Sequence, residues 1–145
     1  MLVNQILVLK GNSEIVTIDP SKTVADAAKL LSERRIGAVV VSEDGTTPLG
    51  ILSERDIVRA LGRNGASVLD GPISELMTRK LSTCVIGENA LTVLERMTEG
   101  RFRHMPVVDE TGQMIGFVSI GDAVSARLKE LHAEKEALTG MIMGS

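Results

Sequence analysis

Two stretches of the sequence decide the fold: Gly50-Ile51-Leu52-Ser53-Glu54-Arg55-Asp56 and Gly116-Phe117-Val118-Ser119-Ile120-Gly121-Asp122. Each consists of a glycine, two apolar residues, a serine and, three residues after the serine, an aspartate. The apolar residues are typical of the end of a buried strand, and a serine followed three residues later by an acid is typical of a helix start. The sequence therefore predicts the same strand-to-helix turn twice.

The similarity between the two halves extends well beyond these stretches. Residues 23–30 and 38–41 recur 67 positions later, and Gly45 recurs as Gly112 at the same offset. One extra residue near Pro48 reduces the offset to 66 before the 50–56 stretch. Self-similarity at a fixed period indicates a structural repeat.

Each half reads as strand, helix, strand, strand, helix. In the first half, residues 15–18 form a β-branched strand, and Ser21 or Thr23 caps a helix that runs to about Arg35. The runs 38–41 and 49–52, joined by a turn that contains glycine, predict a hairpin, and a second helix begins at Ser53. The fold class is therefore α/β.

A short amphipathic helix precedes each half, because Val3, Ile6 and Leu7 match Ile73, Leu76 and Met77 in spacing. We expect repeats at 3–60 and 73–127, a linker at 61–72, and a helical C-terminal extension at 128–143. A unit of about 60 residues buries little core alone. The halves are expected to pack on each other with pseudo-twofold symmetry and to form two equivalent clefts.

Composition excludes several classes of protein. The chain has 145 residues, 43% of them apolar, and a formal net charge of −3, which offers no broad attraction to nucleic acid. It shows no leader peptide and no apolar run long enough to span a membrane, and its single cysteine, Cys84, lies in a segment, 82–86, that reads as a buried strand. We expect a cytoplasmic protein that binds neither nucleic acid nor membranes.

The two aspartates allow two interpretations. Ser53 with Asp56, and Ser119 with Asp122, could serve only to cap helices. Alternatively, the helix ends attract phosphate while the carboxylates accept hydrogen bonds from the cis hydroxyls of a ribose. Recurrence of the pattern in both halves favours ribose binding.

Both halves resemble the cystathionine β-synthase (CBS) domain, a β-α-β-β-α module of about 60 residues that usually occurs in pairs. The resemblance rests on the paired Gly-apolar-apolar-Ser-x-x-Asp motif and covers all but about the last twenty residues. It implies a regulatory sensor whose clefts bind AMP, ADP or ATP, and sometimes NAD(H) or S-adenosylmethionine. It implies no catalytic cofactor.

The resemblance also assigns roles to individual residues. Asp56 and Asp122 would bind ribose, with Ser53 and Ser119 near the ribose or phosphate. The stretches Gly37-Ala38-Val39 and His104-Met105-Pro106 would lie along adenine. Phosphate would be bound by Arg101, Arg103 and His104, and Thr17 would reach into the second cleft from the opposite half.

The C-terminal segment predicts an interaction surface. Residues 121–143 read as one long helix with apolar residues in a 3–4 pattern at Val124, Leu128, Leu131, Leu138 and Ile142, interrupted by Lys135. This stripe could pack back on its own repeat, but a chain this short has little core left to cover it. We expect a homodimer that also contacts an unknown regulated protein.

Two other functions remain as alternatives. One is a structural dimerisation scaffold without ligand. The other is a small nucleotide hydrolase that uses Asp56 or Asp122, although the sequence shows no phosphate-binding Gly-x-x-x-x-Gly-Lys loop and no Ser/His/Asp grouping. His104 and His132 lack partners at metal-ligand spacing, so we expect no metal site and no enzyme.

Overall fold

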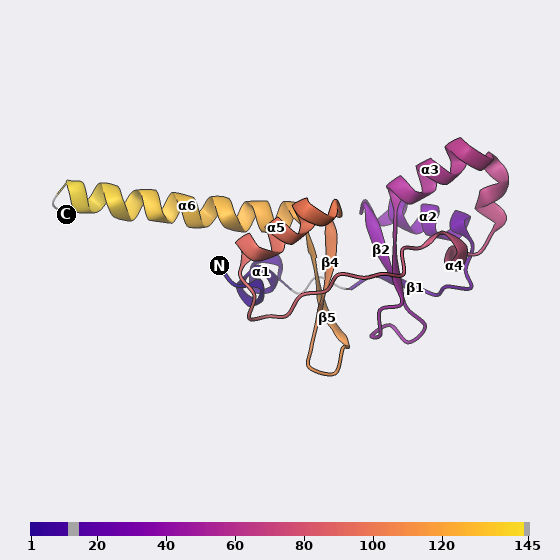
Figure 1. Cartoon of the computed structure of the whole chain (residues 1–145), viewed down its shortest axis with the longest axis horizontal. Helices are drawn as coiled ribbons and strands as arrows, with labels where there is room; N and C mark the ends of the chain where they lie inside the picture. Colours follow the sequence, from indigo (N-terminus) through magenta and orange to yellow (C-terminus); the bar gives the residue numbers. More distant parts are fainter. Residues whose placement is uncertain (12–14, 144–145) are drawn as a thin grey trace. The chain divides into compact units, whose positions relative to one another are not determined.

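A computed structural model describes residues 1–11 and 15–143 of the chain (Figure 1). The chain divides into two compact units. Unit 1 comprises Met1–Ser13, Thr83–Val108 and Gly116–Ser145, and unit 2 comprises Glu14–Ser82 and Asp109–Ile115. The mixed α/β architecture with two strand-and-helix repeats confirms the predicted fold class.

Unit 2 contains a three-stranded sheet covered by helices. Its elements are β1 (Thr17–Ile18), α2 (Val24–Arg34), β2 (Ala38–Val41), β3 (Gly50–Ser53), α3 (Glu54–Asn64), a 3-10 helix (Ala66–Asp70) and α4 (Ile73–Leu76). The strand order is β1-β2-β3, with β1 parallel and β3 antiparallel to β2. Of the two cap candidates, Ser21 and Thr23, it is Thr23 that caps α2.

Unit 1 repeats this arrangement with a two-stranded sheet in place of the three-stranded one. It contains α1 (Val3–Lys10), α5 (Ala90–Gly100), β4 (His104–Val108), most of β5 (Met114–Ser119) and α6 (Ile120–Ile142). Strands β4 and β5 form a two-stranded sheet. Cys84 makes a single parallel bridge to Val107, and the Val108 N–H donates to the Cys84 carbonyl as the Ser42 N–H donates to Ile18 beside the Ile18–Val41 pair of unit 2.

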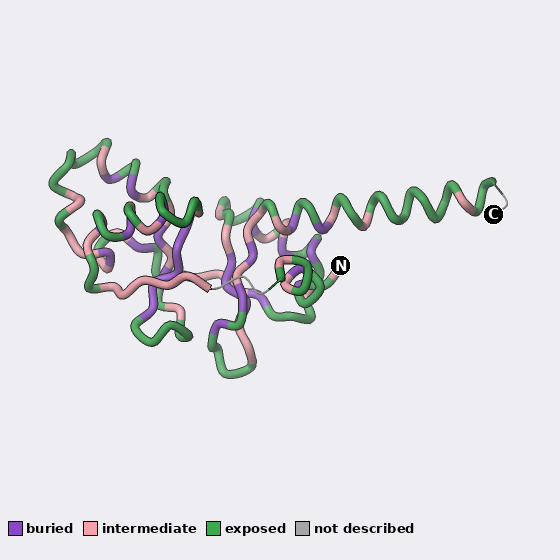
Figure 2. The backbone as a smooth tube through the Cα atoms, turned by 180° about the vertical axis from the view of Figure 1, so that it is seen from behind, coloured by how far each residue is buried: buried purple, intermediate pink, exposed green. Residues whose placement is uncertain are grey.

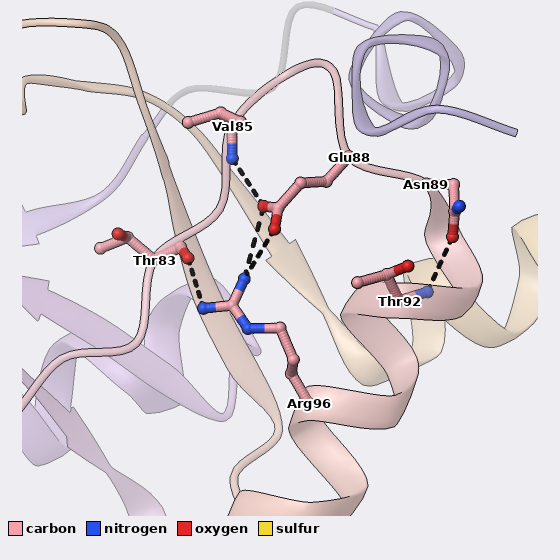
Figure 3. A network of polar contacts seen from close by, with 6 residues as sticks. All are labelled: Thr83, Val85, Glu88, Asn89, Thr92 and Arg96. Carbon is pink, nitrogen blue, oxygen red and sulfur yellow. Dashed lines mark hydrogen bonds and ion pairs between the residues drawn. The ribbon is translucent and has the colours of Figure 1, made fainter.

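The strand predicted over 82–86 is wrong except at this bridge. Val85 and Ile86 are exposed, and the segment turns away after Cys84. The cause is a polar network (Figure 3), in which the Val85 N–H donates to Glu88 Oε2 at 2.9 Å and Arg96 donates to the Thr83 carbonyl at 2.7 Å. Arg96 also pairs with Glu88, which fixes the segment against α5.

The helix that leads each repeat packs on the core formed by the other. Val3 and Ile6 of α1 join the unit 1 core with Val93 and Met97 of α5. Ile73 and Met77, at and after α4, join the unit 2 core around Val24 and Leu31. The compact units therefore differ from the contiguous repeats read along the sequence.

Helix α3 extends further than the sequence indicates. It ends at Asn64, so the first four residues of the stretch expected as a linker are helical. Leu61 explains the extension, because its side chain is partly buried against the unit 2 core.

Equivalent turns confirm the repeat at the level of the backbone. Gly45 and Gly112, the glycines of the two hairpin turns, have φ angles of 84° and 85°. Arg35 and Arg101, which end α2 and α5, have φ angles of 54° and 56° and lie in the left-handed region.

The C-terminal part of α6 is exposed along its length (Figure 2). Its buried residues, Ala123 and Ala126, lie near its start, where it packs on α5 and α1. The predicted long helix is confirmed. No described helix is long and apolar enough to cross a membrane.

Candidate functional site

Ser53 and Asp56 form a reciprocal cap at the start of α3. The Ser53 N–H donates to Asp56 Oδ2 at 2.9 Å, the Ser53 hydroxyl lies 3.0 Å from the same oxygen, and the Asp56 N–H donates to Ser53 Oγ at 3.2 Å. These contacts fix the carboxylate one turn into the helix. Among the described residues, Asp56 Oδ1 accepts no hydrogen bond.

Ser119 and Asp122 repeat this geometry at the start of α6. The Ser119 N–H donates to Asp122 Oδ2 at 2.8 Å, and the Asp122 N–H donates to Ser119 Oγ at 3.1 Å. Here Oδ2 also contacts Lys10 Nζ, at 2.9 Å. The second carboxylate is therefore paired with a cation of α1.

These contacts determine the acidity of Asp122. Burial alone would raise its pKa, but hydrogen bonds from Ser119 and Lys10 and the positive charge of Lys10 outweigh burial. The pKa of Asp122 consequently lies below its ordinary value. The group is a charged acceptor at neutral pH.

One backbone hydrogen bond fastens each helix start to the neighbouring strand. The Glu54 N–H donates to the Gly37 carbonyl at 2.9 Å, and the equivalent Ile120 N–H donates to the Arg103 carbonyl at 2.7 Å. Ala38 pairs with Ser53 in the register of β2 and β3. The structure thus brings the predicted strand residues of each repeat to the capped helix of the same repeat.

The side chains of Val39 and Met105 point into the two cores. Val39 belongs to the unit 2 core and Met105 to the unit 1 core, and both are fully buried. Any contact they make with a ligand is therefore through the backbone. Ala38 and Pro106 precede or follow these residues and, because strand side chains alternate, face the opposite side of each sheet.

The predicted phosphate-binding residues cluster between α5 and β4. Arg101 and Arg103 are exposed, and the His104 ring stacks on Phe117 of β5 with centroids 5.6 Å apart and an interplanar angle of 11°. This stacking fixes the orientation of the imidazole, which directly follows Arg103 in the chain. The cluster lies in the same unit as Asp122.

A family model for the CBS domain matches residues 8–63 and 73–129, which is most of the chain. The protein belongs to the CBS domain family. The two matched segments correspond to the two repeats that the sequence predicts.

Relatives of known structure share this CBS pair architecture. A CBS-domain-containing protein from Agrobacterium tumefaciens is 38% identical, with a TM-score of 0.82 over 88% of this chain and 99% of that one. A CBS domain protein from Pyrobaculum aerophilum, solved in complex with AMP, is 26% identical, with a TM-score of 0.73 over 84% of this chain and 89% of that one.

A curated relative is longer than this chain. The mitochondrial CBS domain-containing protein CBSX3 of Arabidopsis thaliana is 37% identical over 126 residues, which are 84% of this chain. The chain spans about three fifths, 61%, of that protein's length.

Close backbone approach explains the glycine that opens each CBS motif. A Cβ atom at Gly50 would lie 2.8 Å from Met77 Sδ and 2.9 Å from the Thr78 carbonyl oxygen. A Cβ atom at Gly116 would lie 2.8 Å from two methyl carbons of Leu7. Leu7 and Met77 are equivalent positions, so each motif glycine makes room for the segment that leads the other CBS repeat.

Three further predictions concern Thr17, Cys84 and the metal site. Thr17 lies in β1 of unit 2, whereas Asp122 lies in unit 1, so its reach into the second CBS cleft stays a prediction. Cys84 is a buried core residue, and burial raises its thiol pKa to about 12. Within residues 1–11 and 15–143, no three potential metal ligands gather at one place.

Lys10 is the site residue that the sequence reasoning missed. A signal was present, because the offset of 70 that relates Val3 to Ile73 also relates Lys10 to Lys80. A lysine at the end of both leading segments of a CBS pair, together with the paired aspartates, could have indicated an ion pair.

Proposed function

We propose that the chain is a regulatory module that binds adenosine-containing ligands, namely AMP, ADP, ATP or NAD(H), at Asp56 and Asp122. The observation that supports it is the duplicated, rigidly capped carboxylate at the start of α3 and α6. The AMP bound by the Pyrobaculum aerophilum relative supports the same ligand class.

The capping contacts are compatible with ribose binding. Each cap uses Oδ2 of its aspartate, and in the described residues Oδ1 of Asp56 and of Asp122 accepts no hydrogen bond. A cis diol needs acceptors held in a fixed orientation, and a carboxylate is the strongest such acceptor. The cap therefore orients the carboxylate and leaves one of its two oxygens available to a ligand.

The second repeat carries the stronger phosphate-binding group. Arg101, Arg103 and the stacked His104 lie in unit 1 with Asp122, whereas the equivalent first-repeat positions hold Arg35, Gly37 and Ala38, of which only Arg35 is charged. Arginine binds phosphate through paired N–H groups. We therefore assign the more highly charged ligand to the Asp122 site.

Regulation suits these residues better than catalysis. Asp56 and Asp122 are held by helix caps, and Cys84, the one thiol of the chain, is buried with a raised pKa. A nucleophile needs an adjacent base and access to substrate. Ligand binding would act through a difference in affinity between two states of the module.

The absence of tryptophan and tyrosine permits a direct test. Purified protein should absorb little at 280 nm, so a band at 260 nm that co-elutes with the protein reports bound nucleotide. Heat release followed by mass spectrometry identifies the compound. Protein without such a band, and without a thermal shift in AMP, ADP, ATP, NADH or S-adenosylmethionine, would contradict the proposal.

We further propose that α6 pairs with α6 of a second copy. Val124, Leu128, Leu131, Leu138 and Ile142 alternate at spacings of four and three, with Lys135 completing the series, and the five apolar side chains are 39% to 77% exposed. In this heptad Arg127 and Glu134 occupy equivalent flanking positions with opposite charge. Antiparallel pairing of two copies would bring these charges together.

A further inference from the structure

Lys10, which lies outside the CBS motif at 116–122, contacts Asp122. It is the last residue of α1, and its Nζ lies 2.9 Å from Asp122 Oδ2 and 2.6 Å from the Phe117 carbonyl oxygen. The side chains of Lys10 and Asp122 are only 27% and 23% exposed. The contact is therefore a partly buried, geometrically fixed ion pair.

The first repeat lacks the corresponding contact. Lys80 occupies the position equivalent to Lys10, but α4 ends at Leu76 and the chain then pairs Thr78 with Ile51 in an isolated bridge. Lys80 is exposed, and in the described part of the chain it forms no ion pair with Asp56. Before a ligand binds, Asp122 is therefore paired with a lysine, whereas Asp56 forms no such pair with the equivalent lysine.

This difference affects which ligands the second site accepts. A cis diol that donates to both carboxylate oxygens of Asp122 uses Oδ2, which Lys10 already contacts, so such a ligand competes with Lys10 for that oxygen. If an uncharged nucleoside displaces the ammonium group, Lys10 keeps its contact with the Phe117 carbonyl but gives up the negative charge of Asp122 while still partly buried, which is unfavourable. A ligand phosphate supplies a new anion, so the same displacement then costs little.

We propose that Lys10 determines the specificity of the Asp122 site, by holding Asp122 in the ligand-free state and pairing with the phosphate of a bound ligand. The site thereby selects phosphorylated adenosine compounds over adenosine. This inference rests on the proposed nucleotide-binding function. It assigns to α1, at the opposite end of the sequence from the motif, a part in ligand choice.

Calorimetric titration of adenosine and AMP tests this role in a background that isolates the second site. The parent is Asp56→Asn, and it is compared with Asp56→Asn/Lys10→Met and with the matched control Asp56→Asn/Lys80→Met. Loss of Lys10 should weaken AMP binding about fivefold and leave adenosine binding unchanged or tighter, because an ion pair of this exposure is worth roughly 1 kcal/mol. The Lys80 control should behave as the parent.

The outcomes separate the failure of this inference from that of the proposed function. An unchanged ratio of adenosine Kd to AMP Kd in the Lys10→Met variant, while the parent binds AMP, would overturn the role of Lys10 alone. A parent that binds neither compound while the wild-type chain binds AMP would also overturn it. Failure of the wild-type chain to bind any adenosine compound would overturn both. Lys10→Gln provides a second variant, and circular dichroism confirms folding.

Discussion

The backbone of Gly50 passes so close to Met77 that a Cβ atom at position 50 would lie 2.8 Å from the sulfur and 2.9 Å from the next carbonyl oxygen. That carbonyl, of Thr78, accepts a hydrogen bond from Ile51 at 3.0 Å, so it cannot move aside without breaking the bridge. At Gly116 the obstructing atoms belong to the flexible end of Leu7. The two motif glycines are thus constrained to different degrees.

Gly50→Ala should therefore destabilise the protein more than Gly116→Ala does. Overpacking of a fixed backbone typically costs about 1–3 kcal/mol, and rotation of Leu7 should relieve part of the cost at position 116. Urea unfolding of both variants measures the difference. Equal losses, or a larger loss for Gly116→Ala, would contradict the assigned packing.

The ion pair between Lys10 and Asp122 should make stability depend on pH. Because the pKa of Asp122 is lowered in the folded state, its contribution is present above the unfolded pKa of about 3.9 and is lost as the pH falls through the folded value. Lys10→Met should be less stable than wild type by about 0.5–1 kcal/mol at pH 7.

That difference should shrink progressively below about pH 4. Thermal unfolding of both proteins between pH 7 and pH 3 measures it, with Lys80→Met as the control that shows no such trend. A gap between wild type and Lys10→Met that stays constant down to pH 3 would show that the ion pair contributes nothing to folding.

Arg35 and Arg101 should be replaceable by glycine with a gain in stability. Both occupy the left-handed region, where a residue with a Cβ atom costs about 1 kcal/mol relative to glycine. Each of Arg35→Gly and Arg101→Gly should raise the urea midpoint. If Arg101 binds phosphate, Arg101→Gly should also weaken AMP binding while leaving adenosine binding unaffected.

An Arg101→Gly variant that gains stability and binds AMP as wild type does would remove Arg101 from the proposed site. Arg35→Gly serves as the matched control, because it makes the same backbone change in the first repeat.

The exposed stripe of α6 should control assembly. Leu131 is 44% exposed at the middle of the apolar series, and glutamate there would place a charge at the centre of a paired helix interface. Leu131→Glu should convert the dimer to a monomer in sedimentation equilibrium, whereas Ala133→Glu, on the opposite face, should not. A wild-type chain that is monomeric at every concentration would contradict the proposed pairing.

Much of the fold was predictable because the pattern of each element occurs twice in the sequence. The caps at Thr23, Ser53 and Ser119, the hairpin glycines and the length of α6 all depend on residues close together in the sequence. Local patterns of this kind predict secondary structure without knowledge of the tertiary structure.

The remaining features depend on contacts between distant residues. The strand expected at 82–86 is absent because Arg96, in the following helix, binds the Thr83 carbonyl and Glu88 binds the Val85 N–H. The partner of Asp122 lies 112 positions earlier, at Lys10, and the pair forms because α1 packs on the core of the second repeat. No local sequence pattern predicts a contact between residues so far apart in the chain.

Equilibrium dialysis of AMP against the wild-type chain and the Asp56→Asn/Asp122→Asn double variant tests the central proposal most directly. Asparagine retains an oxygen for the serine N–H and so preserves the helix cap, but it removes the charged acceptor for ribose. The double variant should keep its unfolding midpoint within a few degrees and lose AMP affinity at least about tenfold. Equal AMP binding by both proteins would show that the aspartates serve only as helix caps.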